Sequence, residues 1–361
     1  MLVVRMAWRN LWRRARRTLL TVCTVSLGLA LLLLSLGLGD GSHLQMINSA
    51  VRMGSGHVVI QAEGYQERGE IDSALAAAEI ESISRWVERE RREGAIQDSV
   101  PRVFASGLAS SADGSAGVQI IGVEPDIEAR ISLFAEKIVE GSFLEGTENG
   151  RVVIGAGVAD KLEIGLGGRV VLMVQGANSD EISSKLVRVH GVMKLGLEEV
   201  DQAVVLMNLE DAQDFLSLDG QVHQVALLVG NVDSVDSLAT KARAALPGVE
   251  ALSWSEALPE LRDAILVDDG GNYVFHVFIF LLIAFTVMNT LLMSVLERTR
   301  EFALLDAVGL TPRKRFLMVF VEACFISILS IGLGLLLGFS GHLYLSEYGL
   351  PLDAFLSLIH I

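Results

Sequence analysis

Long apolar stretches with almost no charged residues lie on both sides of one large polar region of the chain. The apolar stretches are residues 18–39, 273–296 and 316–345. Each is long enough to cross a hydrocarbon layer of about 30 Å as a helix, which takes about 20 residues. Residues 40–272, between the first two stretches, mix apolar and charged positions. The pattern predicts an α-helical membrane bundle with three spans and one large domain outside the bilayer.

The first apolar stretch follows a basic segment, residues 1–17, as a signal peptide would. Its apolar run of about 22 residues is longer than the usual 7–15 of a signal sequence, and no small-residue cleavage site follows at a convincing position. A retained membrane helix is therefore expected, with a cleaved signal peptide as the alternative.

Residues 40–272 have the mixed pattern of an α+β domain. Helical spacing of apolar residues occurs in 73–93, 209–216 and 235–246. Pro101 and the Gly/Ser-rich stretch 106–117 predict loop material, and a subdomain boundary there is a further hypothesis. Short β-rich runs bounded by Gly and polar residues predict strands at 56–61, 117–123, 151–155, 169–175, 186–193, 203–208 and 224–230.

Charge gives the orientation of the spans. The Lys and Arg residues outside 43–272 fall in two clusters, one within residues 1–17 and one within 297–315. Short cytoplasmic flanks retain positive charge, so both clusters are expected in the cytoplasm. Residues 40–272 are then expected on the opposite side of the membrane.

The large domain is strongly acidic. Residues 43–272 hold 18 of the 29 Lys and Arg and 37 of the 44 Asp and Glu, a net charge of −19. This balance argues against nucleic acid and against adhesion to anionic lipid, and solubility alone would also explain it. Both cysteines, Cys23 and Cys324, lie inside apolar stretches, so the domain is expected to be held together by its core and not by disulfides.

Motifs for chemistry are missing from the sequence. It contains no G-x-x-x-x-G-K-[ST], G-x-S-x-G, H-E-x-x-H, G-x-G-x-x-G or C-x-x-C, and its seven histidines have no metal-ligand spacing. We expect no enzyme activity, metal or cofactor in this chain, unless folding brings distant residues together.

The most specific pattern lies between the second and third apolar stretches. Its first part has the form E-R-x-R-E-x-x-x-L-x-A-x-G, and a basic pair, Arg313 and Lys314, follows before an apolar helix that contains Glu322. This pattern resembles the FtsX-like (MacB/LolC/LolE-type) permease family. The matching residues of the first part are Glu297, Arg298, Arg300, Glu301, Leu305, Ala307 and Gly309.

The resemblance extends along nearly the whole chain and is closest to lipoprotein-releasing permeases. It implies a MacB-like periplasmic core domain on a permease of the bacterial inner membrane. The ATP would be bound by a separate ABC ATPase subunit, and a second permease copy or paralogue, membrane lipid and a lipoprotein or periplasmic partner are the other implied partners. A MacB-like efflux permease and an FtsX-like regulator of cell-wall hydrolases are the alternatives.

Residues 297–315 are too short for a folded domain. Within them, 298–311 alternate apolar and charged positions, which predicts a short amphipathic helix at the membrane surface. In view of the resemblance, we expect this segment to couple the partner ATPase to the spans. The alternative is a connector that anchors two helices at the headgroups.

Polar residues inside the spans have local explanations. Glu322 lies close enough to the basic cluster to form an ion pair, and a role in transport is the alternative. His276 and Asn289 are expected to make hydrogen bonds between helices, and the small residues Gly334 and Gly338 permit close helix contact.

The two ends of the chain complete the expectations. Residues 1–17, with Trp8 and Trp12 among arginines, predict an amphipathic helix on anionic lipid. Members of the resembled family have four membrane helices, and the tail 346–361 is too short and polar to cross the bilayer. We therefore expect the tail to begin the loop before a fourth span, with a three-span protein completed by a partner as the alternative.

Overall fold

The computed structural model describes the chain except for residues 1, 14, 70, 147–148, 176–181 and 349–361. Most of the expected tail therefore lies outside the described residues. The chain divides into two compact units, one formed by Met1–Leu44 with Ala264–Ile361 and the other by Gln45–Asp263. The first contains the three apolar stretches and the second the acidic region.

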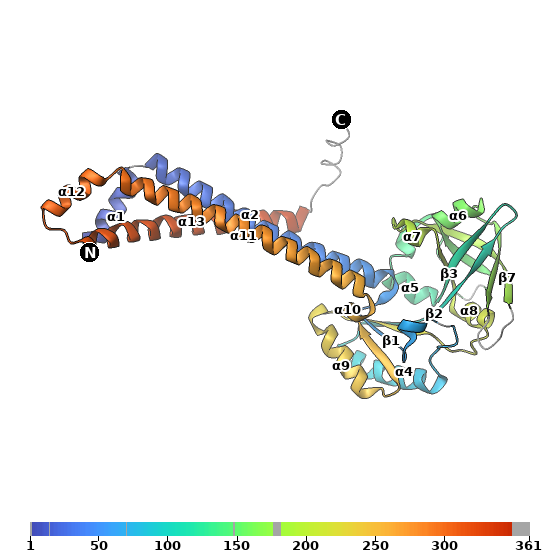
Figure 1. Cartoon of the computed structure of the whole chain (residues 1–361). Coiled ribbons are helices and arrows are strands. Elements are labelled where there is room, and N and C mark those ends of the chain that lie inside the picture. Colours follow the sequence, from blue (N-terminus) through green and yellow to red (C-terminus); the bar gives the residue numbers. More distant parts are fainter. Residues whose placement is uncertain (1, 14, 70, 147–148, 176–181, 349–361) are drawn as a thin grey trace. The chain divides into compact units, whose positions relative to one another are not determined.

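The three apolar stretches are helical, as predicted (Figure 1). They lie in α2 (Ala15–Ala50), α11 (Pro259–Leu296) and α13 (Pro312–Tyr348). All three are long and apolar enough to cross a membrane. The helix α2 extends past the C-terminal end of its apolar run, and α11 begins before the N-terminal end of its own. Both extensions are polar, because hydrocarbon thickness limits the length of the apolar run and not the length of the helix. The membrane boundaries stay predictions.

Small residues let the three long helices approach closely. A Cβ added to Gly334 or Gly338 on α13 would come within about 3 Å of Leu29 or Leu33 on α2. At the contact between α2 and α11, a Cβ on Gly28 of α2 would come within 2.9 Å of Ile283 on α11. The close contact expected of Gly334 and Gly338 is thus confirmed, and it is the packing that small residues permit between membrane helices.

The N-terminal segment forms α1 (Leu2–Arg13), which packs against α13. Leu11 is buried beside Val22 and Ile326, and the Trp8 ring meets Phe325 edge-on at 5.3 Å. The amphipathic helix is confirmed, but part of its apolar face is covered by protein. Contact with lipid remains a prediction.

The acidic region is an α+β domain, and its described strands form one ten-stranded sheet of order β10-β1-β9-β2-β3-β8-β5-β7-β4, with β6 paired to β2 and β7. All seven expected strands are present. The strands are β1 (Val58–Ala62), β2 (Asp98–Ser110), β3 (Ser115–Val123), β4 (Ile138–Gly141), β5 (Arg151–Gly155), β6 (Arg169–Gln175), β7 (Ile182–Met193), β8 (Val204–Asn208), β9 (Gln224–Leu228) and β10 (Val249–Ser253).

Helices cover the sheet, and the three expected from spacing are α4, α8 and α9 (Figure 1). The helices are α3 (Tyr65–Arg68), α4 (Ala77–Arg92), α5 (Pro125–Ile131), α6 (Ala156–Leu162), α7 (Glu198–Asp201), α8 (Leu209–Leu216), α9 (Val235–Ala245) and α10 (Trp254–Ala257). Short turns of other helix types are η1 (Val51–Ser55), η2 (Ala135–Lys137) and η3 (Val232–Ser234).

The expectation of a loop at Pro101 and of a subdomain boundary is wrong, and within 106–117 only residues 111–114 form a turn, between β2 and β3. Residues 98–110 form β2, which pairs with β3, β6 and β9. The Gly-rich composition has a packing reason, because a Cβ on Gly107 would lie 2.5 Å from the carbonyl oxygen of Met173 on β6. A strand that meets three neighbours joins the domain and does not divide it.

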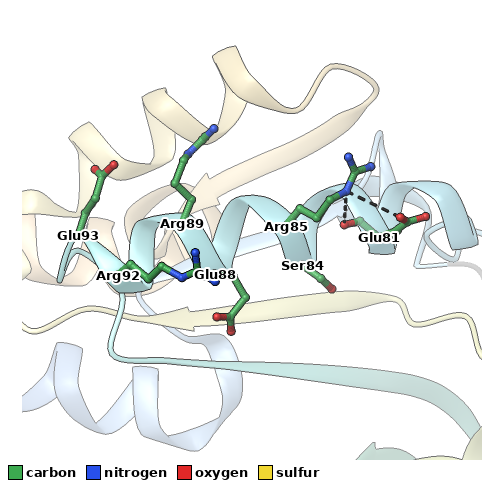
Figure 2. Close-up of a pocket in the computed structure, with 7 residues that line it drawn as sticks. All are labelled: Glu81, Ser84, Arg85, Glu88, Arg89, Arg92 and Glu93. Atoms are coloured by element: carbon green, nitrogen blue, oxygen red, sulfur yellow. Dashed lines mark hydrogen bonds and ion pairs between the residues drawn. The ribbon is translucent and has the colours of Figure 1, made fainter.

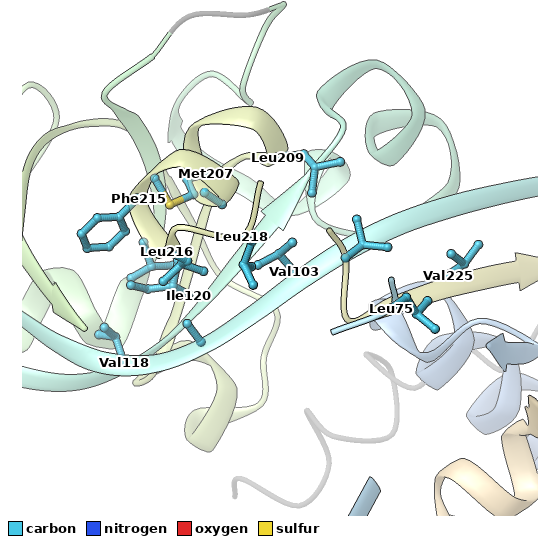
Figure 3. Packing of buried hydrophobic residues seen from close by; sticks show 14 of the residues in the cluster. Leu75, Val103, Val118, Ile120, Met207, Leu209, Phe215, Leu216, Leu218 and Val225 are labelled. Atoms are coloured by element: carbon cyan, nitrogen blue, oxygen red, sulfur yellow. The ribbon is translucent and has the colours of Figure 1, made fainter. Parts of the chain in front are cut away.

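The core lies on both faces of the central strands. Along β8, Val205 and Met207 belong to the larger hydrophobic cluster, whereas Val204 and Leu206 belong to a smaller one. This follows from the period of two in a strand, which sends successive side chains to opposite faces. Figure 3 shows Met207 and Ile120 among the residues of the larger cluster.

Candidate coupling site at the end of the membrane helices

Residues 297–315 contain the expected short helix, α12 (Thr299–Ala307). Gly309 follows the end of α12. Its φ of +91° lies in the left-handed region, and its N–H donates to the carbonyl of Asp306 at 2.9 Å. A Cβ on Gly309 would meet no atom within 4 Å, so the backbone conformation, not crowding, is what favours glycine there. Pro312 then opens α13, at the position where a missing N–H costs nothing.

A buried ion pair joins this segment to α13. The Nη1 atom of Arg298 lies 2.9 Å from Oε2 of Glu322, and the two side chains are only 4% and 9% exposed. The ion pair expected for Glu322 is therefore confirmed, and its basic partner comes from the motif itself. Removing either partner of such a pair leaves a buried charge without compensation.

Two acidic residues of the motif pair with arginines near the N-terminus. Glu297 accepts from Arg17 of α2 at 3.1 Å, and Glu301 of α12 accepts from Arg13 of α1 at 3.0 Å. Arg17 also donates to the carbonyl of Thr290 on α11. These contacts connect α12 and the end of α11 to α1 and α2.

A further ion pair holds α12 to α13. Oδ1 of Asp306 lies 2.9 Å from Nη2 of Arg315. Ala307 is exposed, and the side chain of Leu305 lies outside the described residues. Together with the other pairs, this one connects the segment to each of the described helices α1, α2 and α13.

The outer side of the segment has a different character. Leu304 is 69% exposed and Val308 is 80% exposed. Arg300, Arg313 and Lys314 are also exposed. An exposed apolar pair in a segment with exposed basic residues is the kind of surface on which another protein can dock, because the apolar groups gain by burial and the charges can complement an acidic partner.

Of the two polar residues expected to make hydrogen bonds between helices, one does and the other does not. His276 on α11 lies within hydrogen-bonding distance of Ser35 on α2, with Nε2 and Oγ 3.2 Å apart, as expected. Asn289 is exposed and makes no interhelical hydrogen bond within the described part of the chain. The expectation for Asn289 is not met because its side chain lies on a face of α11 that no described helix covers.

Sequence reasoning missed the roles of Arg13 and Arg17. Both were assigned to membrane orientation, because nothing in their spacing identifies partners about 280 residues away. The sequence shows only that the acidic residues 297 and 301 and the arginines 13 and 17 have opposite charges and so could pair. Only the packing of α1 and α2 beside α12 selects those pairs.

The large domain has a shallow pocket on the exposed face of α4 (Figure 2). It is lined by Glu81, Ser84, Arg85, Glu88, Arg89, Arg92 and Glu93. Glu81 pairs with Arg85 one turn away. Mixed charges at helical spacing on an open surface are typical of a solvated helix face, so this pocket indicates no chemistry.

Two family models match the chain. The MacB-like periplasmic core domain matches residues 18–245, and the FtsX-like permease C-terminal domain matches residues 273–361. The class of protein is therefore an ABC transporter permease of the MacB/LolC/LolE type. The chain belongs to the family of proteins with a MacB-like periplasmic core domain.

The sequences of individual relatives point to the same family. The chain is 22% identical, over 85% of its length and 72% of the relative, to a lipoprotein-releasing system transmembrane protein LolC of Neisseria meningitidis. It is 24% identical, over 66% of its length and 59% of the relative, to a LolE protein of Haemophilus influenzae. The chain thus spans only part of these relatives.

Among solved structures, the periplasmic region of MacB from Actinobacillus actinomycetemcomitans is similar, with a TM-score of 0.40 and 12% identity. That similarity covers 61% of this chain and 98% of that region.

Proposed function

We propose that this chain is the permease subunit of an ABC transporter whose ATPase, with its ATP, is a separate polypeptide. The observation that supports this most is the exposed apolar pair Leu304 and Val308 on α12. The opposite side of the same segment is held by ion pairs to α1, α2 and α13. A partner that moves α12 would therefore move the long helices with it.

The proposed location is the bacterial cytoplasmic membrane, with several spans and with the acidic domain in the periplasm. The basic clusters within 1–17 and 297–315 support a cytoplasmic position for α12. Assembly of the three described spans with a second permease copy or a paralogue belongs to the same proposal.

The proposed substrate is a lipoprotein released from the outer leaflet of that membrane. The similarity to LolC and LolE, which are transmembrane proteins of lipoprotein-releasing systems, supports this choice. The spans also have few polar groups, and the buried acid Glu322 is paired with Arg298. A substrate drawn from the leaflet needs no polar path through the bilayer, unlike a hydrophilic solute.

Recovery of the ATPase with the purified full-length chain tests the docking surface. Val308→Asp should reduce recovery of the ATPase by about tenfold, which corresponds to about 1.4 kcal/mol, because a carboxylate replaces an apolar contact. Val139→Asp is the matched control, since Val139 is 57% exposed on the large domain, and it should change nothing. Equal recovery with both variants would refute docking at α12.

Gly309 provides a second test of the same segment. Gly309→Val should lower stimulation of the ATPase, because a β-branched side chain disfavours φ near +90°. Gly309→Asn should be tolerated better, since asparagine adopts positive φ more readily. If the two variants behave alike, the turn conformation is not what matters.

A further inference from the structure

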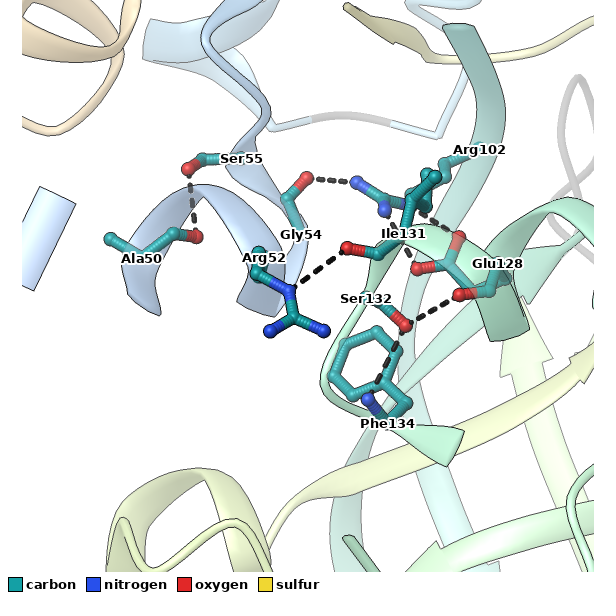
Figure 4. Close-up of polar contacts among 9 residues, drawn as sticks. All are labelled: Ala50, Arg52, Gly54, Ser55, Arg102, Glu128, Ile131, Ser132 and Phe134. Atoms are coloured by element: carbon teal, nitrogen blue, oxygen red, sulfur yellow. Dashed lines mark hydrogen bonds and ion pairs between the residues drawn. The ribbon is translucent and has the colours of Figure 1, made fainter. Parts of the chain in front are cut away.

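The end of α2 inside the large domain is an unusual turn. The π-helical turn η1 contains Gly54 with φ of +132°, and Gly56 follows with φ of +67°. Ser55 Oγ donates to the carbonyl of Ala50 at 2.9 Å, and the Gly56 N–H donates to the carbonyl of Val51 at 3.1 Å. These bonds satisfy carbonyls at the helix end, but the carbonyl of Gly54 points away from the turn (Figure 4).

A buried arginine donates a hydrogen bond to that carbonyl. Arg102 of β2 donates through Nη1 to the oxygen of Gly54. Its Nε and Nη2 atoms donate to the two carboxylate oxygens of Glu128 on α5 at 3.1 and 2.7 Å. The side chains of Arg102 and Glu128 are 3% and 0% exposed. One guanidinium thus holds η1, β2 and α5 together, and its planar fork makes this possible where lysine could make only point contacts.

A second set of contacts connects η1 to the loop after α5. The carbonyl of Arg52 accepts from the N–H of Leu133 at 3.0 Å. Arg52 Nε donates to the carbonyl of Ile131 at 3.3 Å, and its Nη2 pairs with Glu136. The Arg52 pair is partly exposed and so contributes little on its own. The buried contact of Arg102 is the stronger connection.

The other side of η1 is not closely packed. Met53, Gly54 and Ser55 line a cleft, together with Phe104 and Phe134 of the domain. Val51 of the same turn is buried, so the polar contacts of η1 act together with the packing of this side chain. The start of α11 is held by both neutral and charged contacts. The carbonyl of Ala257 just before it accepts from Gln66 Nε2 at 2.9 Å, and Glu256 of α10 pairs with Arg243.

We propose that Arg102 is the positioning residue that fixes the end of α2 to α5 and so passes movement of α2 to the large domain. This inference rests on the proposed function, because the movement would come from ATP hydrolysis by the partner. It assigns transmission to α2 through η1, and α11 would move with α2, because His43 of α2 pairs with Asp268 and Asp269 of α11.

The test uses the full chain reconstituted with its ATPase, carrying Val139→Cys labelled with an environment-sensitive fluorophore after Cys23→Ser and Cys324→Ser. Arg102→Lys keeps the positive charge but lacks the planar guanidinium that contacts Gly54 and Glu128 at the same time. ATP hydrolysis should stay within about twofold of the unsubstituted chain, while the ATP-driven fluorescence change falls about fivefold or more, the lower end of typical coupling between sites. The matched control is Gln66→Ala, which removes the bond before α11 and should keep both signals.

Glu128→Gln is the second variant, because it retains the shape of the acid and removes its charge. Protease resistance of the large domain in the full chain shows whether each variant is folded. A folded variant of either kind with an unchanged fluorescence response overturns the proposal, and so does unfolding of both, which would make Arg102 only a determinant of folding. If the unsubstituted chain gives neither ATPase recovery nor an ATP response, the proposed function itself fails, and this inference fails with it.

Discussion

The buried pair of Arg298 and Glu322 gives the sharpest stability prediction. The variant Glu322→Gln keeps the size of the side chain and removes the negative charge. Arg298 is then left as a buried cation, since it is 4% exposed as a whole residue. Breaking a buried pair in this way costs about 3–5 kcal/mol. The loss should be large because the 2.9 Å contact is replaced by a neutral amide in a site with almost no water.

The control is the exposed pair of Arg13 and Glu301, whose side chains are 69% and 43% exposed. Glu301→Gln should cost only about 0–1 kcal/mol, the usual value of a surface ion pair. The comparison is matched because both changes replace glutamate with glutamine and both pairs are near 3 Å. Burial is the main difference between them.

Unfolding of the purified chain in mixed micelles, with an increasing fraction of denaturing detergent, measures both costs. The double variant Arg298→Met with Glu322→Leu should be more stable than Glu322→Gln, because two apolar side chains leave no charge uncompensated. If Glu322→Gln costs no more than Glu301→Gln, the pair is not buried in the way described and the reasoning is refuted.

Three further predictions concern topology, the surface pairs and pH. A reporter active only in the periplasm should work when fused after Gly150 and stay silent after Thr311, and the reverse pattern would overturn the orientation. Glu301→Arg should lower ATPase stimulation, and adding Arg13→Glu should restore it, so a double variant no better than the single would exclude this pair from coupling. Burial lowers the pKa of His223, against an opposing effect of its bond to a backbone carbonyl. The domain is therefore expected to be stable above the unfolded-state value of about 6.5 and to lose stability as pH falls below it. His223→Asn should flatten the pH dependence of the melting temperature, and an unchanged slope would contradict this explanation.

Much of the fold follows from local pattern. The three long helices were predictable because an uncharged run of about 20 residues has few alternatives. The strand β8 was predictable as a short apolar run bounded by polar residues, and the helix α8 from the helical spacing of its apolar residues. Asn208 marks the change, since its side chain accepts from the N–H of Glu210 as an N-cap.

The missed elements lack such a pattern. Residues 98–110 contain Pro101 and Gly107, which disfavour a central strand in isolation, yet the fold needs a residue without a side chain at Gly107. The edge strand β4 has no buried residue, so it shows no apolar alternation. In both cases tertiary contacts decide the structure and local preference does not.

The site was predictable only in part. The motif and the resemblance identified the segment that contains Glu297 and Glu301, and the ion pair of Glu322 followed from the cost of a charge inside a span. The partners did not follow, because Arg13 and Arg17 lie far away in sequence. The contact of Arg102 with Gly54 was also beyond reach, since a buried pair depends on how β2 and α5 meet.

The central claim is that this chain couples a separate ATPase to a domain across the membrane. The most direct measurement is the rate of ATP hydrolysis by the co-purified ATPase in proteoliposomes, compared with the same ATPase without this chain. We expect a rate that depends on the chain and falls back toward that of the isolated ATPase with Val308→Asp, but not with Val139→Asp. An ATPase rate that is the same with the chain, without it and with Val308→Asp would show that the chain does not couple to the ATPase.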